Sequence, residues 1–216
     1  MNKTDLKLYA ITDRQWQHGA SLSEHVKLAI EGGATMIQIR DKDILSTDSD
    51  AGLKDEYNEA LEIKRICHEH RVPLIINDNV QFAIDIDADG VHLGQDDMNP
   101  AEARKLLGTD KIIGVTAKTV EQAKKAQADG ADYLGSGAVF GSTTKLNAKP
   151  MTKELLSEIT AAVDIPVVAI GGINADNAST LKGTGIAGIA VVGAIFASED
   201  IKAAAKALAE ICDNML

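Results

Sequence analysis

The stretch Pro73-Leu74-Ile75-Ile76-Asn77-Asp78-Asn79 runs from apolar to polar within one residue. An apolar run bounded by a proline and an Asx cluster is typical of a strand that is buried on both faces. A carboxamide and a carboxylate follow where this strand ends, which is where parallel-sheet folds place their functional groups. The alternative is local, because an Asx residue between a strand and a helix is commonly a helix N-cap. The choice depends on how the other strands of the chain end.

Strand and helix patterns alternate along the whole chain. Strands are predicted over residues 6–11, 35–40, 73–76, 90–94, 112–116, 133–136, 166–170 and 188–192. Helices are predicted after Ser21, over 53–70, around 80–84, after Pro100, after Thr119, from 173–175 and from Ile201, with a further one over 155–163. About eight alternations in 216 residues indicate a single (β/α)8 barrel, an α/β fold, spanning residues 1–216. A doubly wound open sheet is less compatible, because its glycine-rich turn after the first strand is missing.

Four glycines stand at matching places in this alternation. Gly33, Gly90, Gly130 and Gly188 each lie between a predicted helix and the next predicted strand. We interpret them as helix C-caps, which require a left-handed backbone that glycine adopts at little cost.

Composition limits the classes of partner. The formal net charge is −10, which argues against a nucleic-acid or anionic-membrane partner and requires local cations or a metal for any anionic substrate. Cys67 and Cys212 fall on apolar helix faces and are expected to be buried, reduced thiols. With no apolar run of 18 residues and no signal-peptide pattern, a cytoplasmic location is expected, and a homo-oligomer stays open.

The predicted strand ends carry two kinds of charge. Arg40, Lys42 and Lys145 are cations that follow the second and sixth strands, although a single cation in such a place is more often a solvated loop residue. Asp78 and Asp97 follow adjacent strands and are the hard oxygen ligands that Mg²⁺ prefers. Together these groups predict a Mg²⁺-assisted diphosphate site.

A second anion site is predicted from glycines. Gly171-Gly172 follows the seventh strand and Gly193 follows the eighth, and barrels commonly bind phosphate between these two loops. Two phosphorylated small molecules on one rim suggest a reaction that joins them and releases diphosphate. The five histidines show no metal-ligand spacing, His92 is expected to be structural, and no nucleophile-elbow motif is present.

The chain resembles the thiamine phosphate synthase family over most of its length. The resemblance rests on Gln-Ile-Arg-Asp-Lys at 38–42, Ile-Asn-Asp at 76–78, Ala-Asp-Gly-Val-His-Leu-Gly-Gln-Asp-Asp at 88–97, Gly-Val-Thr at 114–116, Ser-Thr-Thr-Lys at 142–145 and Ile-Gly-Gly-Ile at 170–173. The segment 88–97 is the most specific of these. The resemblance implies a transferase that joins 4-amino-2-methyl-5-hydroxymethylpyrimidine diphosphate to 4-methyl-5-(2-hydroxyethyl)thiazole phosphate, or to its carboxylated form. The products would be thiamine phosphate and diphosphate.

The resemblance also implies roles for individual residues. The pyrimidine diphosphate would be held by Gln38, Ile39, Arg40, Asp41, Lys42, Asn77, Thr116 and Lys145, among which Arg40, Lys42 and Lys145 would act in catalysis. The thiazole phosphate would contact Ser142, Thr143, Thr144, Gly172, Val192 and Gly193, and one Mg²⁺ per subunit would bind Asp78 and Asp97.

Four positions depart from the common pattern of the family. Thr116 replaces a serine, Gly141 replaces a proline, Ser142 replaces the first threonine of a Thr-x-Thr-Lys loop, and Gly193 replaces a frequent serine and offers only its backbone. Two other functions stay open at this point: a thiazole tautomerase on the same barrel, and a non-catalytic barrel that binds a phosphorylated metabolite.

Overall fold

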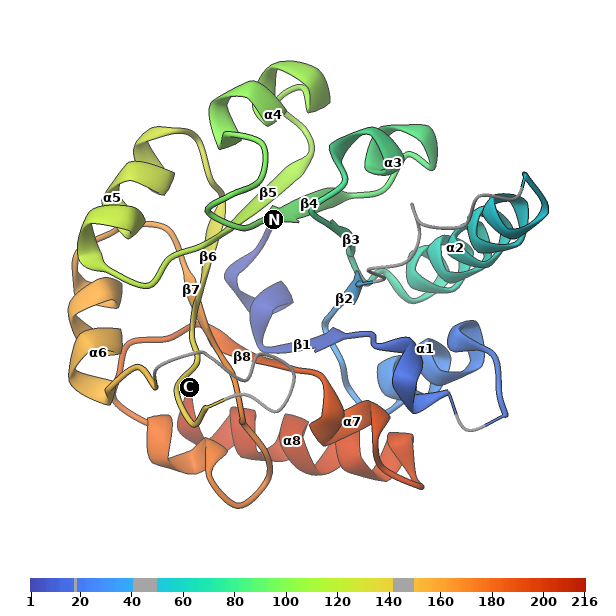
Figure 1. The fold of residues 1–216 in the computed structure, drawn as a ribbon. Coiled ribbons are helices and arrows are strands. Elements are labelled where there is room, and N and C mark those ends of the chain that lie inside the picture. The colour runs from blue at the N-terminus through green and yellow to red at the C-terminus, as the bar shows by residue number, and fades with distance from the viewer. Residues whose placement is uncertain (18, 41–49, 142–149) are drawn as a thin grey trace.

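Eight parallel strands form a closed barrel in the order of the chain. The computed structural model describes residues 1–17, 19–40, 50–141 and 150–216, with side chains from residue 54 onward in the third of these ranges. The strands are β1 (Leu8–Ile11), β2 (Met36–Ile39), β3 (Leu74–Asn77), β4 (Gly90–Leu93), β5 (Ile112–Thr116), β6 (Tyr133–Gly137), β7 (Val167–Ile170) and β8 (Gly188–Val191), and β8 pairs with β1 (Figure 1). The predicted (β/α)8 fold is confirmed.

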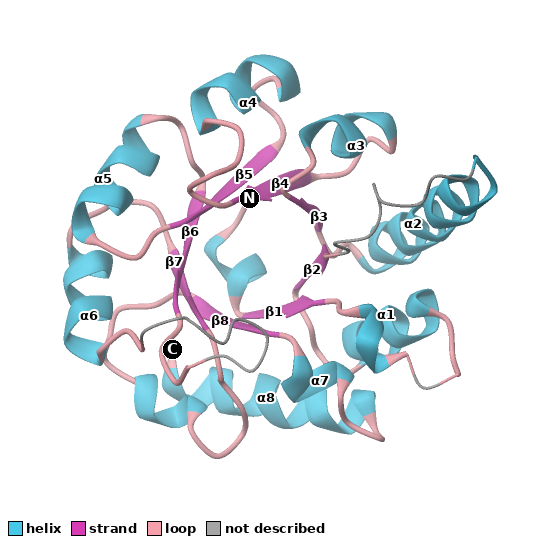
Figure 2. Cartoon of the chain, viewed as in Figure 1, coloured by secondary structure: helices cyan, strands magenta, loops and turns pink. Residues whose placement is uncertain are grey.

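Helices surround the barrel on its outside (Figure 2). The α-helices are α1 (Leu22–Glu31), α2 (Asp50–His70), α3 (Val80–Asp85), α4 (Pro100–Leu107), α5 (Val120–Ala128), α6 (Lys153–Ala161), α7 (Gly193–Phe196) and α8 (Ile201–Met215). Three 3-10 helices accompany them, η1 (Lys3–Leu6), η2 (Arg14–Trp16) and η3 (Ala178–Leu181). Among the helices so described, none is long and apolar enough to cross a membrane.

Two sequence predictions at the ends of elements were wrong. The helix expected from 173–175 does not form, because Asn174 uses its side chain to accept from the backbone of Asp176 and Asn177, and a turn results. Only η3 follows in that connection. The first strand begins at Leu8 and not at residue 6, because Leu6 ends η1 and packs among the side chains inside the barrel.

Alternation along the strands separates two apolar layers. On β1, Tyr9 and Ile11 belong to the cluster inside the barrel, whereas Leu8 and Ala10 belong to the cluster between strands and helices. Successive side chains of a strand point to opposite faces, so this parity holds along each strand. It decides which side chains at the strand ends can enter a site inside the barrel.

The glycines that precede strands serve two purposes. Gly33 and Gly130 have φ angles of 110° and 92°, as the predicted helix C-caps require. Gly188 is instead the first residue of β8, where an added Cβ would lie 1.8 Å from the carbonyl oxygen of Leu6. Gly90 is in the same situation on β4, so the C-cap interpretation was wrong for these two positions.

Candidate active site

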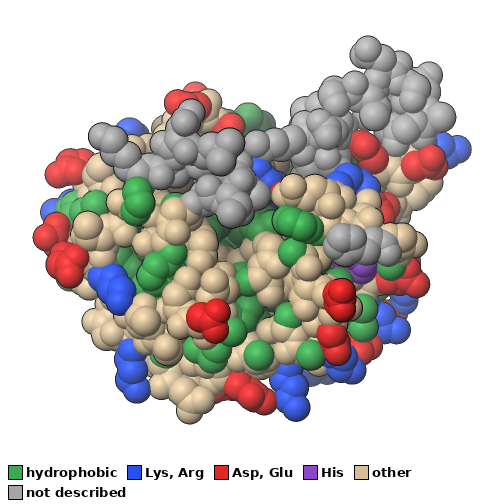
Figure 3. Space-filling model, turned by 60° about the horizontal axis from the view of Figure 1, so that its bottom comes forward, with side chains coloured by type: hydrophobic (Ala, Val, Ile, Leu, Met, Phe, Trp, Pro, Cys, Tyr) green, Lys and Arg blue, Asp and Glu red, His purple; other side chains and the backbone are tan. Residues whose placement is uncertain are grey.

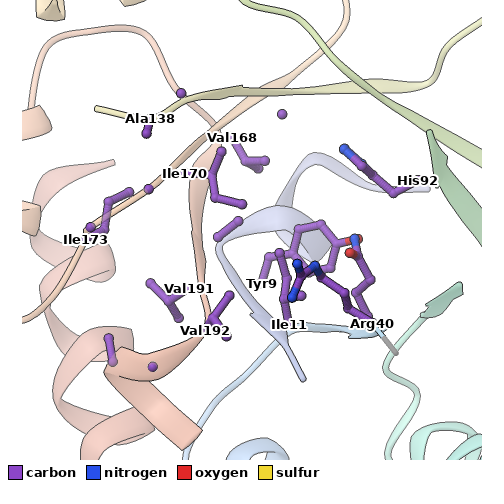
Figure 4. A pocket seen from close by; sticks show the side chains of 18 of the residues that line it. Tyr9, Ile11, Arg40, His92, Ala138, Val168, Ile170, Ile173, Val191 and Val192 are labelled. Carbon is purple, nitrogen blue, oxygen red and sulfur yellow. The ribbon is translucent and has the colours of Figure 1, made fainter. Parts of the chain in front are cut away.

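A cavity of about 530 Å³ opens at the carboxyl ends of the strands. Its volume is in the range of small-molecule sites, which is roughly 300–1,000 Å³. Predicted residues Gln38, Arg40, Asn77, Thr116, Gly172, Val192 and Gly193 all line it. In Figure 4, Tyr9, Arg40 and His92 lie on one side of the cavity and Ala138, Ile173 and Val191 on the other. The cavity therefore has a polar side and an apolar side.

Strand parity explains why the polar residues converge. Gln38 follows Met36 by two residues on β2, and Met36 belongs to the cluster inside the barrel. Arg40 comes two residues later again and keeps this inward direction just past the strand end. Asn77 ends β3 and Thr116 ends β5, and both line the same cavity.

Arg40 is held in place by the neighbouring strand. Its guanidinium lies 3.3 Å from Asp13, which follows β1, and both side chains are only 16% exposed. The backbone N–H of Arg40 donates to the hydroxyl of Thr12 over 3.1 Å. Because Asp13 restricts its rotation, Arg40 presents an oriented charge to the cavity.

The charge of the cavity is opposite to that of the whole chain. Among its described lining residues, Arg40 and Lys118 are cations and none is an Asp or Glu. The molecule as a whole carries a formal charge of −10. Figure 3 shows hydrophobic side chains at the centre of one face, with most of the charged side chains nearer to its periphery. A local positive field of this kind favours an anionic ligand.

The backbone takes an unusual conformation at Asp78. Its φ angle is +61°, a left-handed conformation that is uncommon for residues other than glycine. The backbone N–H of Asp78 donates to the carbonyl oxygen of His92 over 2.8 Å, and the side-chain amide of Asn77 donates to its carboxylate over 2.6 Å. The helix N-cap is Asn79, which accepts from the backbone of Phe82, so the alternative capping role of Asp78 was wrong.

Asp78 and Asp97, the two predicted ligands of Mg²⁺, are not among the residues that line the cavity. Both carboxylates are exposed, and they follow β3 and β4, which pair in the barrel. One oxygen of Asp97 accepts from the backbone N–H of Gly94 over 2.7 Å, which holds that loop in a turn. In the described ranges, no group of three or more His, Cys, Asp or Glu residues could hold a metal ion. Two carboxylates alone suit Mg²⁺, which completes its shell with water and phosphate oxygens.

The opposite wall contains the glycine turn at which the sequence predicted a second anion site. Gly171 and Gly172 both have positive φ angles, of 101° and 66°. A Cβ on Gly172 would lie 2.7 Å from the carbonyl oxygen of Phe140, so the turn packs directly against the backbone that follows β6. Only glycine can be accommodated at this short distance, and without a side chain its backbone is accessible from the cavity.

Some predicted residues do not reach the cavity or lie outside the described residues. Ile39 is 3% exposed and its side chain packs in the layer between strands and helices, so only its backbone could contact a ligand. Asp41, Lys42, Ser142, Thr143, Thr144 and Lys145 lie outside the described residues.

Several lining residues were missed by the sequence analysis. Tyr9, Trp16, His92 and Lys118 line the cavity, and the sequence analysis placed none of them there. Nε2 of His92 lies 3.1 Å from the hydroxyl of Thr116 and its Nδ1 lies 3.0 Å from the hydroxyl of Tyr133. Burial raises the pKa of Tyr9 and of Tyr133 well above the usual range, so both stay protonated. The alternation of side chains along the predicted strands could have identified two of them, because Tyr9 and His92 are separated by an even number of residues from other inward-pointing positions on their strands.

Comparison with known proteins adds the following findings. The family model described as thiamine monophosphate synthase matches residues 8–195. A thiamine-phosphate synthase of Ruminiclostridium cellulolyticum is 48% identical over 99% of this chain and 98% of its own length. One of Clostridium novyi is also 48% identical, over 95% of this chain and 98% of its own length. The structure of thiamine phosphate pyrophosphorylase from Pyrococcus furiosus has a TM-score of 0.87 and 38% identity, covering 99% of this chain and 98% of that one.

Proposed function

Since the chain belongs to the thiamine monophosphate synthase family and is a transferase with thiamine-phosphate synthase function, we propose that it uses the two substrates named above. These are 4-amino-2-methyl-5-hydroxymethylpyrimidine diphosphate and 4-methyl-5-(2-hydroxyethyl)thiazole phosphate or its carboxylated form. The observation that carries the proposal is the two-sided cavity. Arg40 and Lys118 favour an anion there, Gln38 and Asn77 supply amide groups, and the glycine turn approaches from the opposite wall.

The pyrimidine diphosphate is assigned to the polar side. Gln38 and Asn77 would bind the pyrimidine, and Arg40, Thr116 and the backbone of Ile39 would help to hold the diphosphate. Asp41, Lys42 and Lys145 join this set on the resemblance alone, because they lie outside the described residues. In this arrangement Arg40 is aimed by Asp13 before the substrate arrives, which reduces the reorganisation needed at the reaction step.

The thiazole phosphate is assigned to the opposite wall. Gly172, Val192 and Gly193 line the cavity there and would offer backbone N–H groups to the phosphate. Ser142, Thr143 and Thr144 are added from the resemblance. The apolar side chains of this wall would exclude water from the thiazole. With its phosphate held at this wall, the ring nitrogen would face the pyrimidine methylene carbon.

Asp78 and Asp97 are assigned to one Mg²⁺ per subunit, which when bound would neutralise charge on the leaving diphosphate. Breaking the CH₂–O bond moves negative charge onto the diphosphate. Arg40, Lys42 and Lys145 would therefore stabilise the transition state, in which this charge develops, more strongly than the ground state. The resulting pyrimidinylmethyl cation would be captured by the thiazole nitrogen. No side-chain nucleophile is required by this dissociative mechanism.

The test is a reconstituted reaction with both substrates and Mg²⁺. Release of diphosphate together with formation of thiamine phosphate is expected, and omission of thiazole phosphate should prevent product formation. Folded protein that binds both substrates and releases no diphosphate would overturn the proposal. Proton exchange on the thiazole without condensation would instead identify a tautomerase, and binding without any reaction would identify a non-catalytic barrel.

A further inference from the structure

Five polar side chains form a continuous hydrogen-bond chain inside the barrel. Four contacts connect them: Gln38 Nε2 to Tyr9 Oη over 2.5 Å, Tyr9 Oη to Tyr133 Oη over 2.8 Å, Tyr133 Oη to His92 Nδ1 over 3.0 Å, and His92 Nε2 to Thr116 Oγ1 over 3.1 Å. The residues come from β2, β1, β6, β4 and β5 in that order. Both ends line the cavity, whereas Tyr133 in the middle is fully buried and does not.

The barrel wall leaves room for the two rings at the centre of this chain. Gly114 pairs with Tyr133 across β5 and β6, and an added Cβ at Gly114 would lie 2.1 Å from Cζ of that tyrosine. An added Cβ at Gly135 would lie 3.0 Å from Cε1 of His92. Side chains at these two positions would displace the rings, so the hydrogen-bond chain depends on both glycines.

The protons of this chain must all point in one direction. Tyr9 and Tyr133 are protonated, because burial raises the pKa of each phenol, and each hydroxyl has one proton to donate. Tyr9 accepts from the Gln38 amide and therefore donates to Tyr133; with His92 in its neutral form, Tyr133 in turn donates to Nδ1 of that imidazole. The proton on Nε2 is then donated to Thr116, whose own proton is left for a ligand.

The opposite direction of the hydrogen-bond chain requires the side-chain amide of Gln38 to be turned over. If Thr116 donated to His92, each later donor would reverse and Tyr9 would donate toward Gln38. The amide would then have to turn its Oε1 to Tyr9 and its N–H groups to the cavity. The direction of the chain thus decides whether Gln38 offers an acceptor or donors to a ligand.

We propose that this hydrogen-bond chain couples diphosphate binding at Thr116 to recognition of the pyrimidine by Gln38, with Tyr133 as a positioning residue. This inference rests on the proposed function. A diphosphate oxygen only accepts, so it selects the direction in which Thr116 donates to it. In that direction Oε1 of Gln38 faces the cavity and accepts from the 4-amino group of the pyrimidine. A 4-oxo pyrimidine presents an oxygen at that place and is rejected.

The test compares equilibrium binding of the 4-amino pyrimidine diphosphate and its 4-oxo analogue by calorimetry with Mg²⁺. We expect the wild-type protein to prefer the amino compound by about 100-fold or more, because a buried amide that meets the wrong partner loses its hydrogen bond. Tyr133→Phe removes the central hydroxyl and should reduce this preference about tenfold. The affinity for thiazole phosphate should stay within about twofold, since Tyr133 does not line the cavity.

Two further variants separate coupling from general damage. Tyr57→Phe is the control, because it also removes a tyrosine hydroxyl. Tyr57 lies on α2, is 36% exposed, and donates to the backbone carbonyl oxygen of Asp85. This variant should leave the preference for the amino compound unchanged. Thr116→Val should reduce the preference for the amino group at the other end of the chain. If Thr116 acted only on the diphosphate, both compounds would weaken equally and their ratio would not change. Thr116→Val also decides the matter if Tyr133→Phe fails to fold.

The outcomes distinguish this inference from the proposed function. Normal turnover with an unchanged amino-to-oxo ratio in the variants would overturn the coupling and leave the synthase function intact. A wild-type protein that binds neither pyrimidine diphosphate would overturn both.

Discussion

Replacing Gly172 by alanine tests the assignment of the thiazole phosphate site most directly. Gly172 has a φ angle of +66°, and a left-handed alanine costs about 1 kcal/mol or slightly more. Its Cβ would also lie 2.7 Å from the carbonyl oxygen of Phe140 and 3.1 Å from that of Gly141. Both neighbours are backbone atoms that cannot rotate away, so the turn and the segment after β6 must move apart. Relieving such overpacking costs about 1–3 kcal/mol.

The combined cost converts into two measurable changes. A loss of about 3 kcal/mol lowers Tm by about 6–12 °C for a chain of this size, as measured by thermal denaturation. Displacement of the turn should also raise the KM for thiazole phosphate at least about tenfold, which corresponds to about 1.4 kcal/mol of lost binding. The KM for the pyrimidine diphosphate should stay within about twofold, because its proposed contacts lie on the other side of the cavity.

Gly183→Ala is the matched control for this experiment. Gly183 has a φ angle of +85°, but an added Cβ would have no atom within 4 Å. This variant therefore carries only the conformational cost, with a fall in Tm of about 2–4 °C and unchanged KM values. An equal fall in Tm for both variants would refute the steric argument. A wild-type KM for thiazole phosphate in Gly172→Ala would refute the phosphate assignment.

Three further predictions concern the metal ligands, the thiols and the bare glycine after β8. Asp97→Asn should lower kcat/KM by about 100-fold or more and weaken the Mg²⁺ dependence of the rate, because a ligand of the catalytic ion is lost. Asp96 is the exposed neighbour, and Asp96→Asn should have neither effect. Equal effects of the two substitutions would remove the metal assignment. Burial raises the pKa of Cys67 to about 12 and of Cys212 to about 11, so the stability that these thiols contribute is complete below the unfolded value near 8.5 and is lost as pH rises toward 11–12. Denaturant titrations at pH 8 and 10 should show a loss of about 2 kcal/mol per thiol, and rapid labelling of the native thiols at pH 8 would contradict it. Gly193→Ser should fold normally, because an added Cβ meets its nearest atoms at 3.8–3.9 Å, and should lower the KM for thiazole phosphate about threefold by adding one hydroxyl donor; an unchanged KM would place the phosphate elsewhere.

The sequence was sufficient for the barrel because its signals are local. The apolar strand that starts after Pro73 and the helix that follows Ser21 both appear in the structure as predicted, and the helix begins with a capping box between Ser21 and Glu24. Each reflects a choice made within a few residues, by side-chain period or by a cap. The exceptions are local as well: Asn174 formed a turn where a helix was expected, because its side chain competes for the backbone N–H groups.

Part of the candidate site followed from the same reasoning. Arg40 and Asn77 were identified as residues at the ends of predicted parallel strands, and parallel strands end at one rim. Gln38 and Thr116 were named through the family resemblance, and both lie in the last part of predicted strands that reach the same rim. Their convergence on one cavity is a consequence of topology, so it needed no knowledge of distances. The roles assigned to them, and the Mg²⁺ on Asp78 and Asp97, stay predictions.

The sequence by itself determined the order of elements, the rim that carries the site, and the residue types that reach it. Only the tertiary structure decided which side chains meet across the barrel: Asp13 with Arg40, and Tyr9 with Tyr133 between Gln38 and His92. These partners are up to 124 residues apart in the chain. Their contact depends on the register of eight strands and on the glycines that open space between them, and closure of the whole barrel sets that register. No short segment contains this information, which is why these interactions were absent from the sequence analysis.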